Sequence, residues 1–255
     1  KLIRETAGPT MTTSTSQPSP TFKPLYKQVQ ELITERIIEG SWKPGEILPS
    51  EFQLADLLGV SQGTVRKALN ALTEDNVLFR RQGVGTFVSE HTLQKMMFHF
   101  FHFQSDQGDI PELPYAQLLE TRLITPDDQL RTLFELPLEE KVIEIHRVRS
   151  INNTASIREL IYLPHRYFAD LHKEEKLPHS LYHYYQQHFN ITVHKATDRL
   201  KAVLADEQDQ SVLNIAAGQP LLEVSRTARA LDGRTVEYRI SRANSEDLHY
   251  LVELN

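Results

Sequence analysis

Residues Leu48–Val88 read LPSEFQLADLLGVSQGTVRKALNALTEDNVLFRRQGVGTFV, and the order of signals in this stretch predicts how the first part of the chain folds. Ser50 followed by Gln53 is a capping-box pattern, which predicts the start of a short helix that Gly59 ends. Ser61 provides a second N-cap directly afterwards. Two helices separated by so short a turn are typical of a helix-turn-helix.

The sequence on both sides of these two helices extends the motif. Upstream, Pro24 begins a helix that Gly40 ends, since proline is favoured at a helix start and glycine just after a helix end. Downstream, Val77–Arg81 and Thr86–Glu90 alternate as two antiparallel strands joined by a glycine-containing turn. Three helices followed by a two-stranded ribbon predict a winged helix-turn-helix.

The helix after Ser61 has two chemically distinct faces. Apolar residues recur at helical spacing from Val65 to Leu72 and must be buried, whereas a polar and cationic set points away from them. A polar face that stands clear of its own core suits the major groove of DNA, and the free N–H groups at the helix start favour a phosphate. The expected DNA-binding residues are Ser50, Glu51, Ser61, Gln62, Gly63, Thr64, Arg66, Lys67, Arg80, Arg81, Gly83 and Gly85.

The overall charge limits how this chain can contact DNA. Its formal net charge is −6 and its pI is near 6.0, which argues against a protein that coats nucleic acid indiscriminately. Any DNA contact must therefore be local. Within residues 61–85 the balance is positive, with cations at positions 66, 67, 80 and 81 against acids at positions 74 and 75.

The composition also excludes several classes of protein. The sequence contains no cysteine, which excludes disulfide bridges, thiolate metal sites and a cysteine nucleophile, and fits a reducing cytoplasm. No apolar run reaches the roughly 20 residues that a membrane-spanning helix needs, so no membrane contact is expected. No nucleotide-binding loop, metalloprotease motif or nucleophile elbow is present, so we expect no catalytic residue and no cofactor.

Composition shifts divide the chain into four parts. Residues 1–21 are expected to be a tag remnant and a disordered tail rich in Ser, Thr and Pro. Residues 22–90 hold the winged helix-turn-helix. Residues 91–109 change from aromatic to polar and are expected to be a linker whose first part docks as an edge strand, and residues 110–255 are expected to form a second domain.

Strand-like alternation dominates the second domain. Asn152-Asn153 and Asp232-Gly233 are hairpin signals, so the sheet should be mainly antiparallel. Helical segments interrupt the strands, including one that Ser180 caps, and the mixture predicts an α+β fold. The expected strands span 117–125, 141–151, 156–163, 192–205, 221–231, 235–243 and 249–254, and the expected helices 125–136, 181–189 and 205–215 with one more after Pro164.

The first domain resembles the GntR family of bacterial transcription regulators, through the segments PLYKQV, PGEILPSE, VSQGTVRKALNAL and GVGTFV. The second is similar to the effector-binding (UTRA) domain of the HutC-type branch, which has a chorismate-lyase-like fold. The segments that carry this second resemblance are IHRVRS, RELIYLP, HSLYHYY and DGRTVEYRISRANSEDLHY.

The second resemblance implies a small-molecule site on the sheet. The residues that match the family's pattern are Arg147, Arg149, Glu159, Ser180 and Glu237. Paired arginines suit a phosphate or carboxylate, because guanidinium groups offer forked, charge-assisted donors. The alternative for the two arginines is a solvated face that pairs with Glu144 or Glu159. Three nearby histidines do not predict a metal site, since no carboxylate cluster accompanies them; they are His179, His183 and His188.

The sequence therefore predicts a cytoplasmic, homodimeric transcription regulator that binds double-stranded operator DNA. We expect a repressor that a small anionic metabolite releases from a pseudo-palindromic site, with two recognition helices roughly 34 to 36 Å apart. Two alternatives stay open. One is a lyase-like enzyme that acts on a small carboxylic acid, because fold similarity alone does not fix function. The other is an activator with the same architecture.

Overall fold

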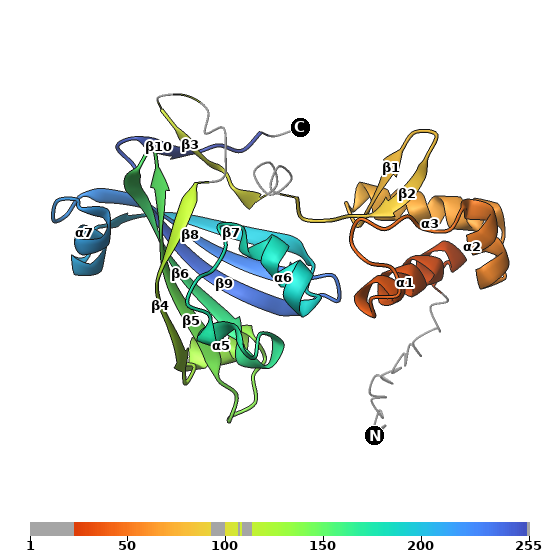
Figure 1. Ribbon diagram of the computed structural model, residues 1–255, viewed down its shortest axis with the longest axis horizontal. Coiled ribbons are helices and arrows are strands. Elements are labelled where there is room, and N and C mark those ends of the chain that lie inside the picture. The colour runs from red at the N-terminus through yellow and green to blue at the C-terminus, as the bar shows by residue number, and fades with distance from the viewer. Residues whose placement is uncertain (1–22, 93–99, 107, 109–113, 254–255) are drawn as a thin grey trace, which may run out of the picture.

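The chain folds into two lobes (Figure 1). A computed structural model describes residues 23–92, 100–106, 108 and 114–253. The smaller lobe holds three helices and a short ribbon, and the larger lobe holds a broad antiparallel sheet with helices on both faces (Figure 1). The tail expected over residues 1–21 lies outside the described residues.

The helices of the small lobe begin and end where the sequence signals lie. They are α1 (Leu25–Ile38), α2 (Glu51–Leu58) and α3 (Gln62–Glu74). Ser50 and Gln53 form the predicted capping box, with the Ser50 hydroxyl accepting from the Gln53 N–H and the Gln53 side chain accepting from the Ser50 N–H. Gly59 closes α2 with a φ of 64°, a left-handed conformation that glycine adopts at little cost.

The core of the small lobe is built from one face of each helix. Val29, Ile33 and Ile37 of α1 pack with Leu54 of α2 and with the apolar face of α3. The predicted division of α3 is confirmed, since its four apolar positions are at most 4% exposed and its polar positions face solvent. Leu57, which helical spacing assigns to the core, is instead 56% exposed, because α2 is short and packs mainly through Leu54.

The ribbon consists of β1 (Leu78–Arg81) and β2 (Gly85–Val88), paired in antiparallel register. Gly83 turns the chain with a φ of 71°. Gly85 is required by a close approach, since a Cβ there would lie 2.9 Å from the Ile47 side chain. The ribbon is therefore held against the loop that precedes α2.

The large lobe is built on a six-stranded sheet with the order β4-β5-β6-β9-β8-β7, in which every neighbouring pair is antiparallel. The predicted hairpins are confirmed, because Asn152 and Asn153 both have positive φ between β5 and β6, and Gly233 lies between β8 and β9. The strands are β4 (Tyr115–Ile124), β5 (Val142–Ile151), β6 (Thr154–Pro164), β7 (Val193–Leu204), β8 (Pro220–Ala230) and β9 (Thr235–Asn244).

Helices cover both faces of this sheet. Helix α6 (Leu181–Phe189) packs on what we call the inner face, against a core that includes Ile143, Ile145 and Ile161. Helices α5 (Asp128–Leu133) and α7 (Glu207–Leu213) pack on the outer face. The helix expected after Pro164 is wrong, since two short 3-10 turns take its place; they are η1 (His165–Tyr167) and η2 (Leu171–Lys173).

A small two-stranded sheet joins the segment between the lobes to the end of the described chain. Strand β3 (Phe103–Ser105) pairs with β10 (Leu248–Tyr250), and their apolar side chains pack with Ile157 and Val224 of the large sheet. An edge strand is expected in the first part of this segment, and β3 confirms such a strand at Phe103–Ser105, later in the segment than expected. Residues 93–99 lie outside the described residues. Part of the expected linker is therefore anchored to the large lobe.

Candidate DNA interface and effector site

The start of α3 presents a pre-formed polar edge. Ser61 is the N-cap, and its hydroxyl accepts from the Thr64 N–H at 3.2 Å and lies 2.9 Å from the Thr64 hydroxyl. Gln62 and Gly63 are exposed beside it. A Cβ on Gly63 would have the Ser61 hydroxyl at 3.9 Å as its nearest neighbour, so the backbone here is open to an approaching phosphate.

Glu51 connects α2 to the two cations beside that edge. Its carboxylate accepts from Arg66 Nε at 2.8 Å and lies 3.5 Å from the Arg80 guanidinium. A carboxylate repels DNA phosphates, so this geometry fits Glu51 as a residue that orients Arg66 of α3 and Arg80 of the ribbon. The sequence pattern grouped Glu51 with the DNA-contacting residues, but it could not distinguish contact from positioning.

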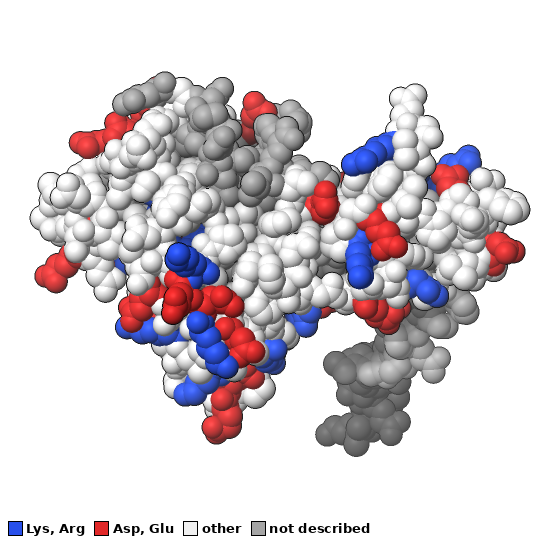
Figure 2. Space-filling model, viewed as in Figure 1, with Lys and Arg blue, Asp and Glu red and all other residues white. Residues whose placement is uncertain are grey.

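Two further cations of the expected interface rest on aromatic rings. Lys67 Nζ lies 4.1 Å from the centre of the Tyr26 ring, and the Arg81 guanidinium lies 4.9 Å from the Phe87 ring and 5.4 Å from the Phe79 ring. Such contacts hold the charge in place at small energetic cost and leave its outer donors free. Figure 2 shows cations interspersed with acids on both lobes, with no continuous basic face on the side in view.

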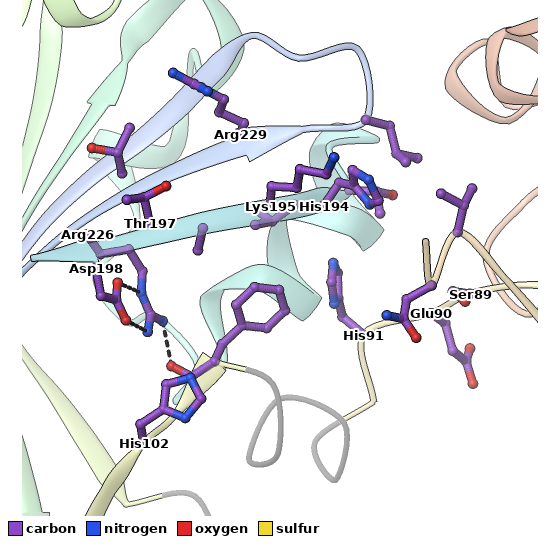
Figure 3. A pocket seen from close by; sticks show the side chains of 18 of the residues that line it. Ser89, Glu90, His91, His102, His194, Lys195, Thr197, Asp198, Arg226 and Arg229 are labelled. Carbon is purple, nitrogen blue, oxygen red and sulfur yellow. Dashed lines mark hydrogen bonds and ion pairs between the residues drawn. The ribbon is translucent and has the colours of Figure 1, made fainter. Parts of the chain in front are cut away.

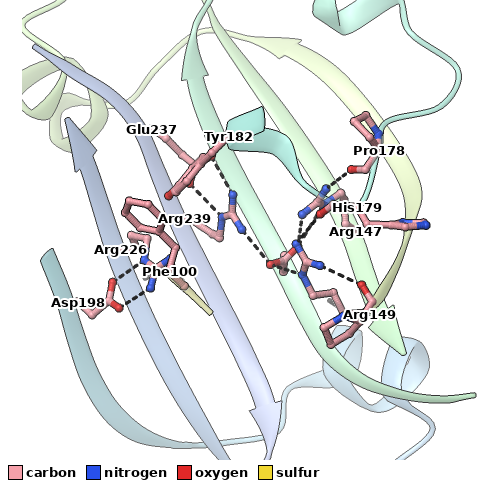
Figure 4. A network of polar contacts seen from close by, with 12 residues as sticks. Phe100, Arg147, Arg149, Pro178, His179, Tyr182, Asp198, Arg226, Glu237 and Arg239 are labelled. Atoms are coloured by element: carbon pink, nitrogen blue, oxygen red, sulfur yellow. Dashed lines mark hydrogen bonds and ion pairs between the residues drawn. The ribbon is translucent and has the colours of Figure 1, made fainter. Parts of the chain in front are cut away.

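The inner face of the large sheet carries a buried cluster of charges (Figure 4). Glu159 of β6 lies at its centre. Its carboxylate accepts from Arg147 Nη2 at 2.6 Å, from Arg149 Nε at 2.9 Å and from Arg239 Nη1 at 3.1 Å. The two arginines of β5 also donate to the backbone, Arg147 to the Pro178 carbonyl and Arg149 to the His179 carbonyl.

Arg239 continues the cluster towards α6. It donates two hydrogen bonds to Glu237, at 3.0 and 2.9 Å, in addition to its bond to Glu159. The Glu237 carboxylate also accepts from the hydroxyls of Tyr182 and Tyr185, each at 2.9 Å. Glu237 is fully buried, and all of its carboxylate contacts are charged or hydroxyl donors.

A second ion pair completes the inner-face cluster. Arg226 of β8 binds both carboxylate oxygens of Asp198, at 2.7 and 2.6 Å, and donates to the carbonyl of Phe100. Tyr250 donates its hydroxyl to the same aspartate. We use the term inner-face cluster for these seven charged residues: Arg147, Arg149, Glu159, Asp198, Arg226, Glu237 and Arg239.

Burial and charge pull the pKa values of this cluster in opposite directions. Burial alone would raise the pKa of Glu159, but three guanidinium groups outweigh it and hold that pKa well below its usual value. Burial lowers the pKa of Arg149 to about 10, helped by the neighbouring Arg147 and Arg239 and opposed by Glu159. Burial and the Glu237 carboxylate both raise the pKa of Tyr185, so its hydroxyl stays a donor.

The inner-face cluster carries an excess positive charge. Four guanidinium groups face three carboxylates, all at most 15% exposed at the side chain. Ser180, directly before α6, is 4% exposed, and its buried hydroxyl has no hydrogen-bond partner among the described residues. Ser180 does occupy the N-cap position of α6, but its side chain makes no capping bond, so that part of the prediction is wrong.

The structure brings together the five residues expected at the effector site. Arg147, Arg149, Glu159 and Glu237 belong to one cluster, and Ser180 follows the two carbonyls that the arginines bind. The alternative of a solvated face is wrong, since both arginines of β5 are at most 3% exposed. Their ion-pair partner is Glu159, while Glu144 lies on the outer face and pairs with Arg122.

The sequence did not identify three of the seven residues of the inner-face cluster, namely Asp198, Arg226 and Arg239. Arg239 lies two residues from Glu237 on one strand, so strand alternation places both on the same face and could have identified it. Nothing local identifies Arg226, whose partner Asp198 comes from the neighbouring strand. The tyrosines of α6 resembled ordinary core residues.

Two cavities adjoin the inner-face cluster. A small one of about 20 Å³ is lined in part by Glu159, Arg239 and Ser241. A larger one of about 770 Å³ lies between the lobes, where Ser89, Glu90 and His91 face β7 and β8 (Figure 3). Four residues line both cavities and so form the wall between them: Phe100, His102, Arg226 and Tyr250.

Comparison with known proteins identifies the two lobes. Residues 25–88 match the family described as bacterial regulatory proteins of the gntR family, and residues 113–249, more than half of the chain, match the UTRA domain. The chain belongs to the GntR family. Its second domain is a UTRA domain, as the resemblance to the HutC-type branch implied.

Relatives of this GntR-family chain align along most of their length. The mannosyl-D-glycerate transport/metabolism system repressor MngR of Escherichia coli is 29% identical over 90% of this chain and 95% of its own. The histidine utilization repressor of Pseudomonas putida is 28% identical over 83% and 84%. The solved structure of YydK from Bacillus subtilis has a TM-score of 0.55 at 23% identity, covers 89% of this chain and 99% of its own, and shows the same fold.

Family membership decides between the functional classes left open by the sequence. This GntR-family protein is a DNA-binding transcription regulator, and the lyase-like enzyme is ruled out by the family rather than by any feature of the fold. None of the helices in the described part of the chain is long and apolar enough to cross a membrane. The described residues likewise hold no group of three or more His, Cys, Asp or Glu that could bind a metal.

Proposed function

We propose that this regulator is a cytoplasmic, homodimeric repressor that binds a pseudo-palindromic operator through α3 and the ribbon and leaves it when a small anion binds the inner-face cluster. We assign DNA binding to residues 22–90, connection to residues 91–109 and effector binding to residues 110–255. The observation that carries the DNA-binding half is the exposed, capped start of α3 on a helix whose opposite face is wholly buried.

The proposal gives the residues of the DNA interface two kinds of role, base recognition and contact with the phosphate backbone. Gln62 reads a base edge, because its amide can bond bidentately to adenine in the major groove. The backbone of Gly63 and the hydroxyl of Thr64 contact phosphate at the helix start. Arg66 contacts phosphate with the donors that Glu51 leaves free. The remaining interface residues are Ser50, Ser61, Lys67, Arg80, Arg81, Gly83 and Gly85, which contact or position the backbone.

A gel-shift experiment tests the DNA-binding half. Purified protein is titrated against fragments from the upstream regions of its own genome at several salt concentrations. Arg66→Ala should weaken binding to all fragments and reduce the slope of log affinity against log salt by about one, whereas Gln62→Ala should reduce discrimination between fragments. Lys27→Ala, an exposed cation on α1, is the control. Unchanged affinity of Arg66→Ala would exclude this docking geometry.

The excess positive charge of the inner-face cluster supports an anionic effector. An unbalanced buried charge is costly, and a phosphate or carboxylate would neutralise it and accept from the forked donors of Arg147 and Arg149. The unpartnered hydroxyl of Ser180 could donate to the same anion. Because the small cavity holds about one water, the ligand must displace part of its wall, and the larger cavity between the lobes offers the approach.

A release experiment tests the effector half. Phosphorylated sugars, products of amino-acid breakdown and organic acids are screened by thermal shift, and compounds that stabilise the protein are added to the protein bound to its fragment. Arg147→Ala should keep DNA binding and lose release. Reporter transcription with and without the compound then fixes whether the protein represses or activates. Release that survives in Arg147→Ala would remove this arginine from the site.

A further inference from the structure

Helix α6 touches both the inner-face cluster and the segment that leaves the DNA-binding domain. On one side Tyr182 and Tyr185 donate to Glu237. One helical position further, Gln186 accepts from the His91 N–H at 2.9 Å and donates to Thr192 at 3.0 Å. The ring of His183 donates to the His91 carbonyl at 2.8 Å. The backbone of His91 is thus held on both its N–H and its carbonyl by one helix.

The start of α6 is held by the two arginines of β5. Arg147 and Arg149 donate to the carbonyls of Pro178 and His179, which lie just ahead of the helix (Figure 4). Both arginines also bind Glu159. A ligand that draws either guanidinium towards itself therefore competes directly with the bonds that fix the beginning of α6.

We infer that α6 transmits a change at the effector site to the DNA-binding domain. Gln186 and His183 bind the segment after the ribbon to this helix, and we call these two contacts the grip of α6. The inference rests on the proposed effector site. Its physical basis is an unbroken series of contacts from Arg147 and Arg149 through Glu159, Arg239 and Glu237 to the tyrosines of α6, and from the same rigid helix to His91. Packed helices move as units, so a shift at one end of α6 is felt at the other.

Further contacts between described residues also join the two lobes. Asn190, directly after α6, donates to the Ile38 carbonyl at 2.8 Å, and Leu231 packs against the core of the small lobe. The hollow of about 770 Å³ separates much of the remaining facing surface. A ligand that moves α6 would therefore change how the DNA-binding domain is held, and with it the spacing of two recognition helices in a dimer. A variant that only speeds local exchange at α6 keeps the arrangement that binds DNA.

Hydrogen–deuterium exchange of the peptide spanning residues 88–92 tests the grip itself. The amide of His91 is bonded to Gln186, so Gln186→Leu should speed its exchange about tenfold, as expected for the loss of one buried hydrogen bond. Gln187→Leu, on the exposed side of the same helix, should not. Exchange at the wild-type rate in Gln186→Leu would show that α6 does not hold this segment.

A second set of variants tests the coupling without any effector. Arg147→Gln removes a donor to the Pro178 carbonyl far along the chain from His91 and should speed exchange at residues 88–92 several-fold. Arg158→Gln removes another buried arginine, on the outer face of the adjacent strand, and should leave that peptide unchanged while destabilising the lobe. Equal acceleration in both variants, or in neither, would overturn the inference.

The tyrosine hydroxyls provide the intermediate step. Tyr182→Phe combined with Tyr185→Phe removes both bonds to Glu237 and should accelerate exchange at residues 88–92, whereas Tyr184→Phe should not. Unchanged exchange of peptides from β5 and β6 shows that the variant is folded. These measurements need neither DNA nor ligand, so a failure to retard DNA would refute the proposed function and leave this result standing.

Discussion

The two faces of the large sheet each carry a buried arginine cluster, but the clusters differ in charge and in what they hold. On the outer face Arg158 and Arg242 bind three carboxylates, two of which also form the capping box of α7; we call this the outer-face cluster, and its acids are Asp206, Asp209 and Glu223. Acid exceeds base there by one. On the inner face base exceeds acid by one, and a buried hydroxyl has no partner among the described residues.

This difference fits a structural role for the outer-face cluster and the binding role that we propose for the inner-face cluster. The outer-face cluster anchors α7, and its acidic excess is partly exposed at Asp206, where water can compensate it. The inner-face cluster has no such exposed member. Buried charges are a doubtful source of stability, since desolvation offsets their attraction. The unbalanced cation of the inner-face cluster supports our proposal that an anion binds there.

Removing an acid from the outer-face cluster should produce the largest change. Asp209 is fully buried and binds Arg158 at 2.6 Å and Arg242 at 2.9 Å. Asp209→Ala would leave the buried guanidinium of Arg158 and the partly exposed one of Arg242 without this partner, and should lower the free energy of unfolding by about 3 to 5 kcal/mol. Urea denaturation measures the loss, with the exposed Glu207→Ala on the same helix as control. A loss below about 1 kcal/mol would contradict a structural role.

The inner-face cluster should respond to acid through Glu159. Its pKa is held well below the usual 4.5 in the folded protein, so the unfolded chain binds a proton first as the pH falls. This stabilisation is present above about pH 4.5 and is lost below it, with a slope of up to about 1.4 kcal/mol per pH unit. Unfolding free energies between pH 3 and pH 7 should be less steep in Glu159→Gln. An identical slope would mean that other carboxylates dominate acid unfolding.

Anions should distinguish the two clusters directly. At roughly ten times its dissociation constant, inorganic phosphate that binds only the folded protein stabilises it by about 1.4 kcal/mol, or a rise in Tm of about 3 to 6 °C. We expect this rise in the wild type and in Arg242→Gln of the outer-face cluster, but not in Arg147→Gln. Sodium chloride at matched ionic strength is the control. A rise that disappears only in the outer-face variant would reverse our assignment.

The smallest change in stability should come from the exposed ion pair of the DNA interface. The Arg66 side chain is 58% exposed where it binds Glu51. Exposed pairs contribute at most about 1 kcal/mol, so Arg66→Ala should barely change the Tm although it weakens DNA binding. A large loss of stability would mean that Arg66 supports the fold, and its effect on DNA would then need a different explanation.

The helices and turn that carry the proposed DNA interface could be predicted from the sequence because their signals are local. Ser61, the glycine beside Gln62 and the apolar spacing of α3 all lie within one stretch of chain, and helix periodicity assigns each residue to a face. Only Glu51 needed the structure, since its partners Arg66 and Arg80 come from two other elements.

The inner-face cluster was predictable only in part because strand order assembles it. Resemblance supplied Arg147, Arg149 and Glu159, but β9 lies between β6 and β8, and this order is what brings Arg239 and Arg226 into the cluster. Alternation assigns a residue to a face and cannot say which strand lies beside it. The strand boundaries were predicted within a few residues, whereas β3 and the 3-10 turns lacked any periodic signal.

The pairing of β3 with β10 has a consequence for biosynthesis. Phe103 lies opposite Tyr250, so the two partners are separated by nearly the whole second domain along the chain. A ribosome makes the N-terminal domain first, and domains generally fold as units during synthesis. The DNA-binding domain can therefore fold, and contact DNA, before β10 has been translated. Until then β3 has no strand to pair with.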